Sequence, residues 1–419
     1  LGGIALLAAV SAAGASGLQT IHSFCATPQD GCSDGASPSN LTRDAAGNLF
    51  GTTPVGGTGR AGTIFELSRD PETGDWTYRV IYSFCADGSC TESPSSPLIV
   101  DTAGNLYGTA YNTVYGAGYG GIYKLSPNRN GTKWRYDALH KFNADGYMSE
   151  SALTYAGAAS GLSYDGVSPL YGASALGGEN RAGNIYMLTP KSGVWHFKII
   201  HRFCETDCSD GSAPFATPIL DEAGNLYGAT VVGGQANSGV VFKLSRSRGT
   251  WSETVLYDFC SAANCADGEM PRSLIMDAAG NLLGTTLTGG QCNTPGYCGV
   301  AFKITPDGRE STLYAFCAKR DCGDGSFPFS ALNMNANGKL YGTTMQGGGH
   351  DTDPGGVGGG TVFALGDHHR VLYRFCAQAA CADGYYPSST LLPGGQGNFF
   401  GVTQRGGATD GGTVFELTP

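Results

Sequence analysis

The sequence is poor in charged residues and has no excess of basic ones. Asp, Glu, Lys and Arg make up 14% of the 419 residues, and 35 acidic side chains outnumber 25 basic ones, for a net charge of −10. Proteins that bind nucleic acid present clustered Lys and Arg side chains to the phosphates. The composition therefore argues against nucleic acid as a partner, and equally against an anionic membrane surface.

Helical periodicity and membrane-length hydrophobic runs are also missing. One apolar stretch, residues 1–17, is too short and too rich in Gly for a stable membrane span. It resembles the hydrophobic and cleavage regions of a secretory signal, and the alternative is an apolar arm of the mature protein. In the second case Ile4, Leu6, Leu7 and Val10 supply its large apolar side chains. We expect residues 1–17 to be separate from the domain formed by residues 18–419.

Glycine and cysteine are abundant instead. The 67 Gly follow no collagen-like period and fit short strands joined by turns. The 14 Cys fall into close pairs, which is typical of local disulfides in a secreted, extracellular or cell-surface protein. A zinc site is the alternative, but it needs two pairs close together, and the repeated pairs lie one to a unit. The predicted disulfides are Cys25–Cys32, Cys85–Cys90, Cys204–Cys208, Cys260–Cys265, Cys292–Cys298, Cys317–Cys322 and Cys376–Cys381.

A motif built around Phe-Cys recurs along the chain. Its Phe falls at seven positions separated by 56 to 61 residues, and in most copies Cys-x-Asp-Gly-x-x-Pro follows after a short gap. Each unit contains four strand-like runs between Gly, Asn and Asp turns. Four antiparallel strands repeated seven times predict an all-β fold, a seven-bladed β-propeller. The seven positions are Phe24, Phe84, Phe142, Phe203, Phe259, Phe316 and Phe375.

The two ends of the repeat array predict how the ring closes. Residues 18–24 form a lone copy of the outermost strand, and residues 385–419 end after the third strand of the last unit. We therefore expect strand 18–24 to complete the blade formed by 385–419, which pairs sheet edges that are otherwise open. An open solenoid is the alternative, and it leaves strand 18–24 without a partner.

Together these motifs resemble the GloVer tandem-repeat family of secreted bacterial proteins. The matching elements are the Leu-Tyr-x-Phe run, the Asp-Gly-x-x-Pro turn, Asp-x-x-Gly-Asn-Leu-Tyr-Gly-Thr-Thr, and a Gly-Gly pair followed by Gly-Thr-Val-Phe-x-Leu. They cover nearly all of residues 18–419. The resemblance implies export and a location at or outside the cell surface, and it implies no catalytic residues.

The residues that the units share favour structure over chemistry. The repeated Asp of the Cys turn is expected to accept backbone N–H bonds within its own turn. Bound Ca²⁺ is the alternative, although one carboxylate per turn is few for a calcium site. The sequence contains no nucleophile elbow, phosphate loop or His-Glu-x-x-His motif. We therefore predict no catalytic residues, no metal site and no cofactor, and a protein that is not an enzyme.

Departures from the repeat gather in the loops that follow the second strand of units two, five and six. Aromatic and polar loop residues of this kind stack on sugars or contact proteins, and a solvated loop is the alternative. Three potential ligands within residues 350–353 do not converge easily on a metal. The candidate recognition residues are Tyr111, Tyr115, Tyr119, His350, Asp351 and Asp353.

Three functions are compatible with these observations. The first is a structural protein that self-assembles with copies of itself into a filament or layer, because seventeen extended residues span up to roughly 55–60 Å and reach a neighbour. The second is a monomeric propeller that binds an extracellular glycan or protein through the loop face. The third, a hydrolase or lyase that uses the central opening, rests on fold analogy alone.

Overall fold

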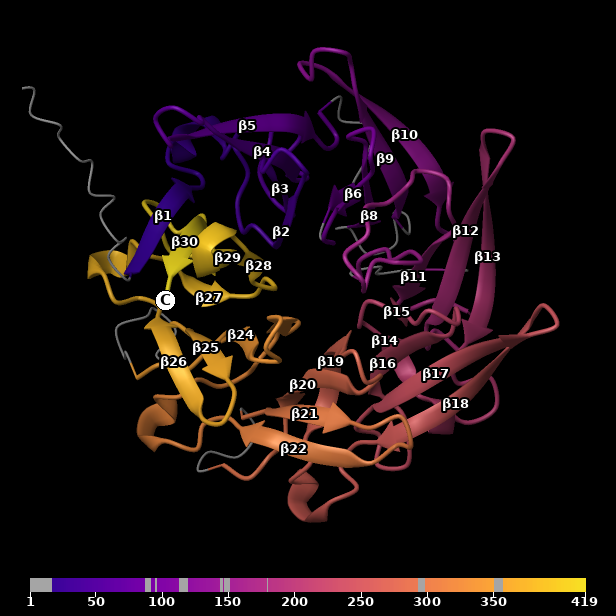
Figure 1. Ribbon diagram of the computed structural model, residues 1–419. Helices are drawn as coiled ribbons and strands as arrows, with labels where there is room; N and C mark the ends of the chain where they lie inside the picture. Colours follow the sequence, from indigo (N-terminus) through magenta and orange to yellow (C-terminus); the bar gives the residue numbers. More distant parts are fainter. Residues whose placement is uncertain are drawn as a thin grey trace, which may run out of the picture.

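The computed structural model describes residues 17–86, 92–94, 96–112, 120–143, 146, 151–178, 180–292, 298–349 and 357–419. Seven antiparallel sheets stand side by side in a ring (Figure 1). The prediction of a seven-bladed β-propeller is therefore confirmed. Within the described residues no helix has both the length and the apolar character needed to cross a membrane.

The first four blades use the following strands. Blade 1 contains β2 (Asn40–Arg43), β3 (Leu49–Thr53), β4 (Thr63–Arg69) and β5 (Trp76–Ser83). Blade 2 contains β6 (Glu92–Pro94), β7 (Ile99–Val100), β8 (Leu106–Asn112), β9 (Gly121–Pro127) and β10 (Trp134–Lys141). Blade 3 contains β11 (Leu170–Ser174), β12 (Asn184–Lys191) and β13 (Val194–Arg202). Blade 4 contains β14 (Ser212–Pro214), β15 (Ile219–Leu220), β16 (Leu226–Val232), β17 (Val240–Ser247) and β18 (Thr250–Asp258).

The remaining three blades complete the ring. Blade 5 contains β19 (Glu269–Met276), β20 (Leu282–Thr288), β21 (Val300–Ile304) and β22 (Glu310–Ala315). Blade 6 contains β23 (Asn333–Met334), β24 (Leu340–Thr344), β25 (Thr361–Leu365) and β26 (His369–Arg374). Blade 7 contains β27 (Tyr385–Pro387), β28 (Leu392–Pro393), β29 (Phe399–Arg405), β30 (Thr413–Thr418) and β1 (Gly17–Ser23). Short 3₁₀ turns lie at η1 (Pro28–Asp30), η2 (Cys208–Asp210), η3 (Ala263–Cys265), η4 (Arg320–Cys322), η5 (Ala379–Cys381) and η6 (Gly395–Gly397).

The turn between the first two strands of a blade is held by its own side chains. In blade 5 the carboxylate of Asp277 accepts the backbone N–H of Asn281 at 2.8 Å and its side-chain amide at 2.7 Å. Gly280 adopts a φ of +79° between them, a conformation that favours glycine. The Asp-x-x-Gly-Asn motif therefore forms the tight turn that the sequence predicted.

The ring closes as predicted, through the first described strand. β1 is antiparallel to β30, with Leu18 opposite Leu417 and Gln19 opposite Glu416, so it is the outermost strand of blade 7. The backbone N–H of Phe24 continues the contact by donating to the carbonyl of Gly412 at 3.0 Å. The strand begins at Gly17, one residue earlier than expected. In Figure 1 the two ends of the propeller accordingly meet in one sheet, indigo beside yellow.

Aromatic side chains pack consecutive blades together. The Phe of the repeated motif is almost fully buried in every unit, and Phe24 lies among residues of both blade 7 and blade 1. Each Trp packs edge-on against an aromatic ring of the preceding blade, which covers apolar surface between blades. These pairs are Trp76–Phe400, Trp134–Phe50, Trp195–Tyr107 and Trp251–Tyr171.

Blade 3 departs from the expected four strands. Its sheet has three strands, and the innermost strand is reduced to a single bridge between Thr154 and Tyr171. Unit three contains an insertion relative to the other units, residues 160–168. It packs on blade 2, where the buried ring of Tyr164 meets Tyr107 edge-on at 5.2 Å. The insertion is therefore part of the core between blades 2 and 3.

Candidate functional site

The Cys turns brace the connections between blades. The structure contains disulfides at six of the predicted pairs: Cys25–Cys32, Cys204–Cys208, Cys260–Cys265, Cys292–Cys298, Cys317–Cys322 and Cys376–Cys381. Cys85 is also disulfide-bonded, and Cys90 lies outside the described residues.

The repeated Asp is a brace for the same turn. Buried Asp324 accepts the backbone N–H groups of Ala318 and Lys319 at 3.0 and 3.1 Å, and the hydroxyl of Tyr314 at 2.7 Å. Asp267 and Asp383 repeat this arrangement in blades 5 and 7. Because backbone amides and a phenol already bind these oxygens, the motif stabilises the loop and gives no evidence for a calcium site.

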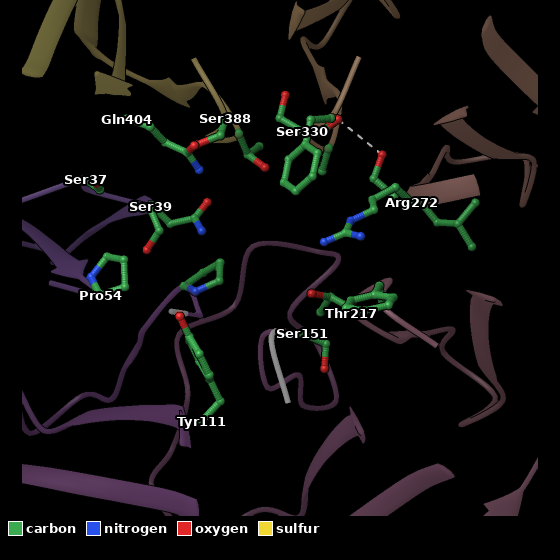
Figure 2. A pocket seen from close by; sticks show the side chains of 18 of the residues that line it. Ser37, Ser39, Pro54, Tyr111, Ser151, Thr217, Arg272, Ser330, Ser388 and Gln404 are labelled. Carbon is green, nitrogen blue, oxygen red and sulfur yellow. Dashed lines mark hydrogen bonds between the residues drawn. The ribbon is translucent and has the colours of Figure 1, made fainter. Parts of the chain in front are cut away.

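Most of the predicted recognition residues lie outside the described part of the chain. This holds for Tyr115, Tyr119, His350, Asp351 and Asp353, and also for the arm residues Ile4, Leu6, Leu7 and Val10. Tyr111 is described, but it belongs to β8 instead of a loop. Its side chain reaches into the centre of the ring (Figure 2).

A cavity of ≈ 490 Å³ occupies the centre of the propeller (Figure 2). This volume lies within the range of about 300–1,000 Å³ that is usual for small-molecule sites. Every blade contributes to its wall, mostly from the segment at or beside its innermost strand. One lining residue from each blade, in order, is Ser39, Tyr111, Ser151, Thr217, Arg272, Ser330 and Gln404.

Arg272 is held in this cavity between two aromatic rings. Its guanidinium carbon lies 4.2 Å from the centre of the Phe215 ring and 4.4 Å from that of the Phe329 ring. All three residues follow the Pro of their Asp-Gly-x-x-Pro motif, in blades 4, 5 and 6. A cation placed over aromatic faces is attracted by the ring quadrupole, so the stack fixes the guanidinium in the cavity.

The electrostatic character of the cavity differs from that of the whole protein. Among the described lining residues Arg272 carries the one formal charge, and hydroxyl and amide side chains supply most of the other polar groups. The protein as a whole has a net charge of −10. A positive group inside a concave, low-dielectric wall raises the local concentration of anions.

Hydroxyl groups lock the wall on either side of Arg272. Ser273 lies 3.0 Å from the Thr285 hydroxyl and donates to the carbonyl of Ser330 in the next blade at 3.3 Å. The Ser330 hydroxyl is 2.8 Å from that of Thr343. Because these hydroxyls tie the lining segments of blades 5 and 6 to their own blades and to each other, the wall beside Arg272 is preorganised.

A second cluster lies at the outer joint between blades 3 and 4. His201 Nε2 is 3.7 Å from an oxygen of Asp210 and 3.8 Å from an oxygen of Glu253. Burial lowers the pKa of His201 to about 4. Burial and the charge of Asp210 raise the pKa of Glu253 to about 8. Sequence analysis did not identify this cluster because its members lie on three separate elements, β13, η2 and β18, and share no local motif.

The sequence also missed Arg272, although a signal was available. The position after the motif Pro varies from unit to unit, from Ser39 to Phe215, Arg272, Phe329 and Ser388, while the Pro itself recurs. In a propeller such a position has the same radial place in each blade. Different residues at this position in different blades therefore indicate a single site at the axis of the propeller, to which each blade contributes a different side chain.

Comparison with known proteins finds one matching family model and a shared fold. The family model of the Gloeobacter/Verrucomicrobia repeat matches residues 158–356. No curated protein matches the sequence.

Two solved structures share the propeller fold at low sequence identity. The first is the extracellular domain of a one-component system protein from B. thetaiotaomicron, with a TM-score of 0.55 and 10% identity over 95% of this chain and 39% of that one. The second is the Swd1 β-propeller domain from Myceliophteria thermophila, with a TM-score of 0.54 and 10% identity over 92% of this chain and 97% of that one. This chain therefore spans well under half the length of the first of these proteins. At such identities the likeness concerns the fold alone. The match of the Gloeobacter/Verrucomicrobia repeat model to residues 158–356 confirms the resemblance to the GloVer repeat family that the motifs indicated.

Proposed function

We propose that this protein is an extracellular, non-catalytic binding propeller that holds a small acidic ligand in its central cavity. The local disulfides support an oxidising location, because such bonds persist outside the cytosol. The cavity supports binding because residues of all seven blades line it and several of its polar groups are preorganised.

The observation that carries the proposal is the stacked guanidinium of Arg272. Phe215 and Phe329 cover its two faces, which restricts hydrogen bonding to its edge. That edge matches two oxygens of a planar oxyanion, and the resulting bidentate pair is stronger than a neutral hydrogen bond. Arg272 already interacts with another part of the chain, and a guanidinium has five N–H donors, so we propose that a ligand carboxylate pairs with the donors that remain.

The rest of the lining favours a ligand with many hydroxyl groups. Ser39, Thr217 and Gln404 are neutral donors and acceptors around the same space, and Tyr111 adds a phenol. Neutral groups of this kind pair with sugar hydroxyls without charge repulsion. We therefore infer that the ligand is an acidic sugar, of the uronic acid type, at the end of or within a short glycan.

Binding of sugars by calorimetry tests the proposal. The wild-type protein should bind glucuronate or galacturonate, and should bind glucose or galactose at least about tenfold more weakly, because the charge-assisted pair contributes roughly 1.5–3 kcal/mol. R272Q should lose the preference for the acidic sugar. R272K should also weaken binding, because Lys lacks the planar fork.

A matched control uses an Arg that is stacked elsewhere. Arg69 lies 5.6 Å from the Trp76 ring and does not line the cavity. R69Q should bind the acidic sugar as the wild type does. Equal binding of acidic and neutral sugars by the wild type, or unchanged binding by R272Q, would refute the proposal.

A second proposed function is self-assembly through residues 1–17. The supporting observation is that β1, which begins at Gly17, is the outermost strand of blade 7. An apolar segment at that place can reach the sheet edge of a neighbouring copy. Deleting residues 1–16 should convert assemblies into monomers in analytical ultracentrifugation, and an unchanged sedimentation profile would refute this role.

A further inference from the structure

The joint between blades 3 and 4 brings together three potential metal ligands. His201 lies on β13, Glu253 on β18, and Asp210 ends the η2 turn between the two blades. The nitrogen of His201 and one carboxylate oxygen from each of the other two residues all lie within 4.8 Å of one another. The individual distances from His201 Nε2 are 3.7 Å to Asp210 and 3.8 Å to Glu253.

This joint differs from two other joints at which the preceding blade also supplies a His. At the joint of blades 7 and 1, His22 stacks on Tyr78, with ring centres 3.8 Å apart. At the joint of blades 2 and 3, His140 stacks on Phe197 at the same separation. Glu253 occupies the position of these aromatic partners, two residues after the Trp of its unit. A carboxylate has thus replaced the ring that faces the His elsewhere.

Two atoms of the cluster lack a hydrogen-bond partner. His201 Nε2 and Glu253 Oε1 are buried and make no hydrogen bond. The side chains of His201 and Glu253 are only 18% and 12% exposed. Leaving buried polar atoms without partners costs free energy, and two carboxylates close together repel one another. A cation placed between the three side chains gives His201 Nε2 a partner and offsets the repulsion between the two carboxylates.

We propose that His201 Nε2, Asp210 Oδ2 and Glu253 Oε2 bind a divalent first-row transition-metal ion that links blades 3 and 4. Ligand atoms around a tetrahedral zinc ion lie about 3.3–3.5 Å apart, so small side-chain movements bring these atoms to that geometry. Imidazole with carboxylates suits such ions better than calcium or magnesium, which prefer oxygen ligands alone. Asp210 is already oriented, since both its oxygens accept the backbone N–H of Cys204 at 2.9 and 3.0 Å.

Zinc binding to the full chain tests this site. After treatment with EDTA and its removal, the wild-type protein should bind about one Zn²⁺ per chain in calorimetry. Its thermal unfolding midpoint should rise by about 3 °C or more in excess Zn²⁺, because a ligand that binds only the folded state stabilises it. E253Y, which supplies the ring found beside His22, and E253Q, which keeps the shape, should each lose both effects.

A matched control lies at the joint of blades 7 and 1. His22 is 3.3 Å from Asp34 there, but Tyr78 replaces the third ligand, so H22F should keep the zinc response of the wild type. Near-ultraviolet circular dichroism identifies the folded variants, and E253Q serves if E253Y does not fold. The site is refuted if wild type binds no Zn²⁺, or if folded E253Q binds it as tightly as the wild type. Because no sugar is added, this result is independent of ligand binding in the central cavity.

Discussion

Replacing Phe24 with Ala tests whether the strand at the N-terminal end of the ring closes the propeller. Phe24 is fully buried, and its ring lies 5.2 Å from Phe65. The surrounding cluster includes Leu49 of blade 1 and Val414 of blade 7. Removing this ring therefore opens a cavity at the joint between the last blade and the first.

The expected cost follows from the burial of the ring. A buried Phe changed to Ala typically lowers the free energy of unfolding by about 3–5 kcal/mol, the sum of lost transfer energy and cavity formation. Phe259 offers a matched site, because it holds the same repeat position within the chain, is 1% exposed and packs against Phe302 at 4.9 Å. F24A and F259A should therefore destabilise the protein by similar amounts.

Urea unfolding followed by tryptophan fluorescence measures both variants under the same conditions. The comparison distinguishes a ring in which β1 is paired with β30 from one in which β1 is detached. If β1 is paired with β30 in solution, F24A costs about 3–5 kcal/mol, as F259A does. If β1 is detached, Phe24 is already exposed and F24A costs less than about 1 kcal/mol while F259A keeps its full cost. That second outcome would refute the closure of the ring through β1.

Two further predictions concern buried polar groups. Burial lowers the pKa of His369 from its ordinary 6.5 to about 4, so acidification protonates this side chain in the unfolded chain first, and the stability of the protein should fall between pH 6.5 and 4. The variant H369F keeps a ring on Tyr314, and its melting temperature should fall less steeply over that range. An identical slope for H369F and the wild type would contradict the assignment. D324N should lower the free energy of unfolding by at least about 2 kcal/mol, because Asp324 accepts three hydrogen bonds as a charged group. A loss below about 0.5 kcal/mol in urea unfolding would show that Asp324 does not brace the turn.

Much of the fold could be predicted because its signals are local. Strand period, Gly and Asn turns and Cys spacing act over a few residues, and seven copies of each reinforce one another. Blade 3 was less predictable, because its innermost strand is reduced to the bridge at Thr154 and its insertion packs on the neighbouring blade. Packing between blades is a long-range contact that the repeat pattern does not encode.

The candidate sites were less accessible to sequence reasoning than the fold. A residue such as Arg272 differs from its counterparts in the repeat, so a search for shared motifs passes over it. Glu253 is similar, since it stands where units one, two and three carry an aromatic residue. In both cases the departure from the repeat was the signal, and its meaning depended on which residues from other units lie beside it.

The sequence by itself determined the number of blades, the order of their strands, the joint between β1 and β30 and the bracing role of the Cys turns. These follow from local pattern and from the counting of repeats. Only the tertiary structure decided that Arg272 is stacked between Phe215 and Phe329 at the axis, and that His201 and Glu253 meet at one joint. The physical reason is the closed ring, which brings equivalent positions of different units together around one axis and at each joint.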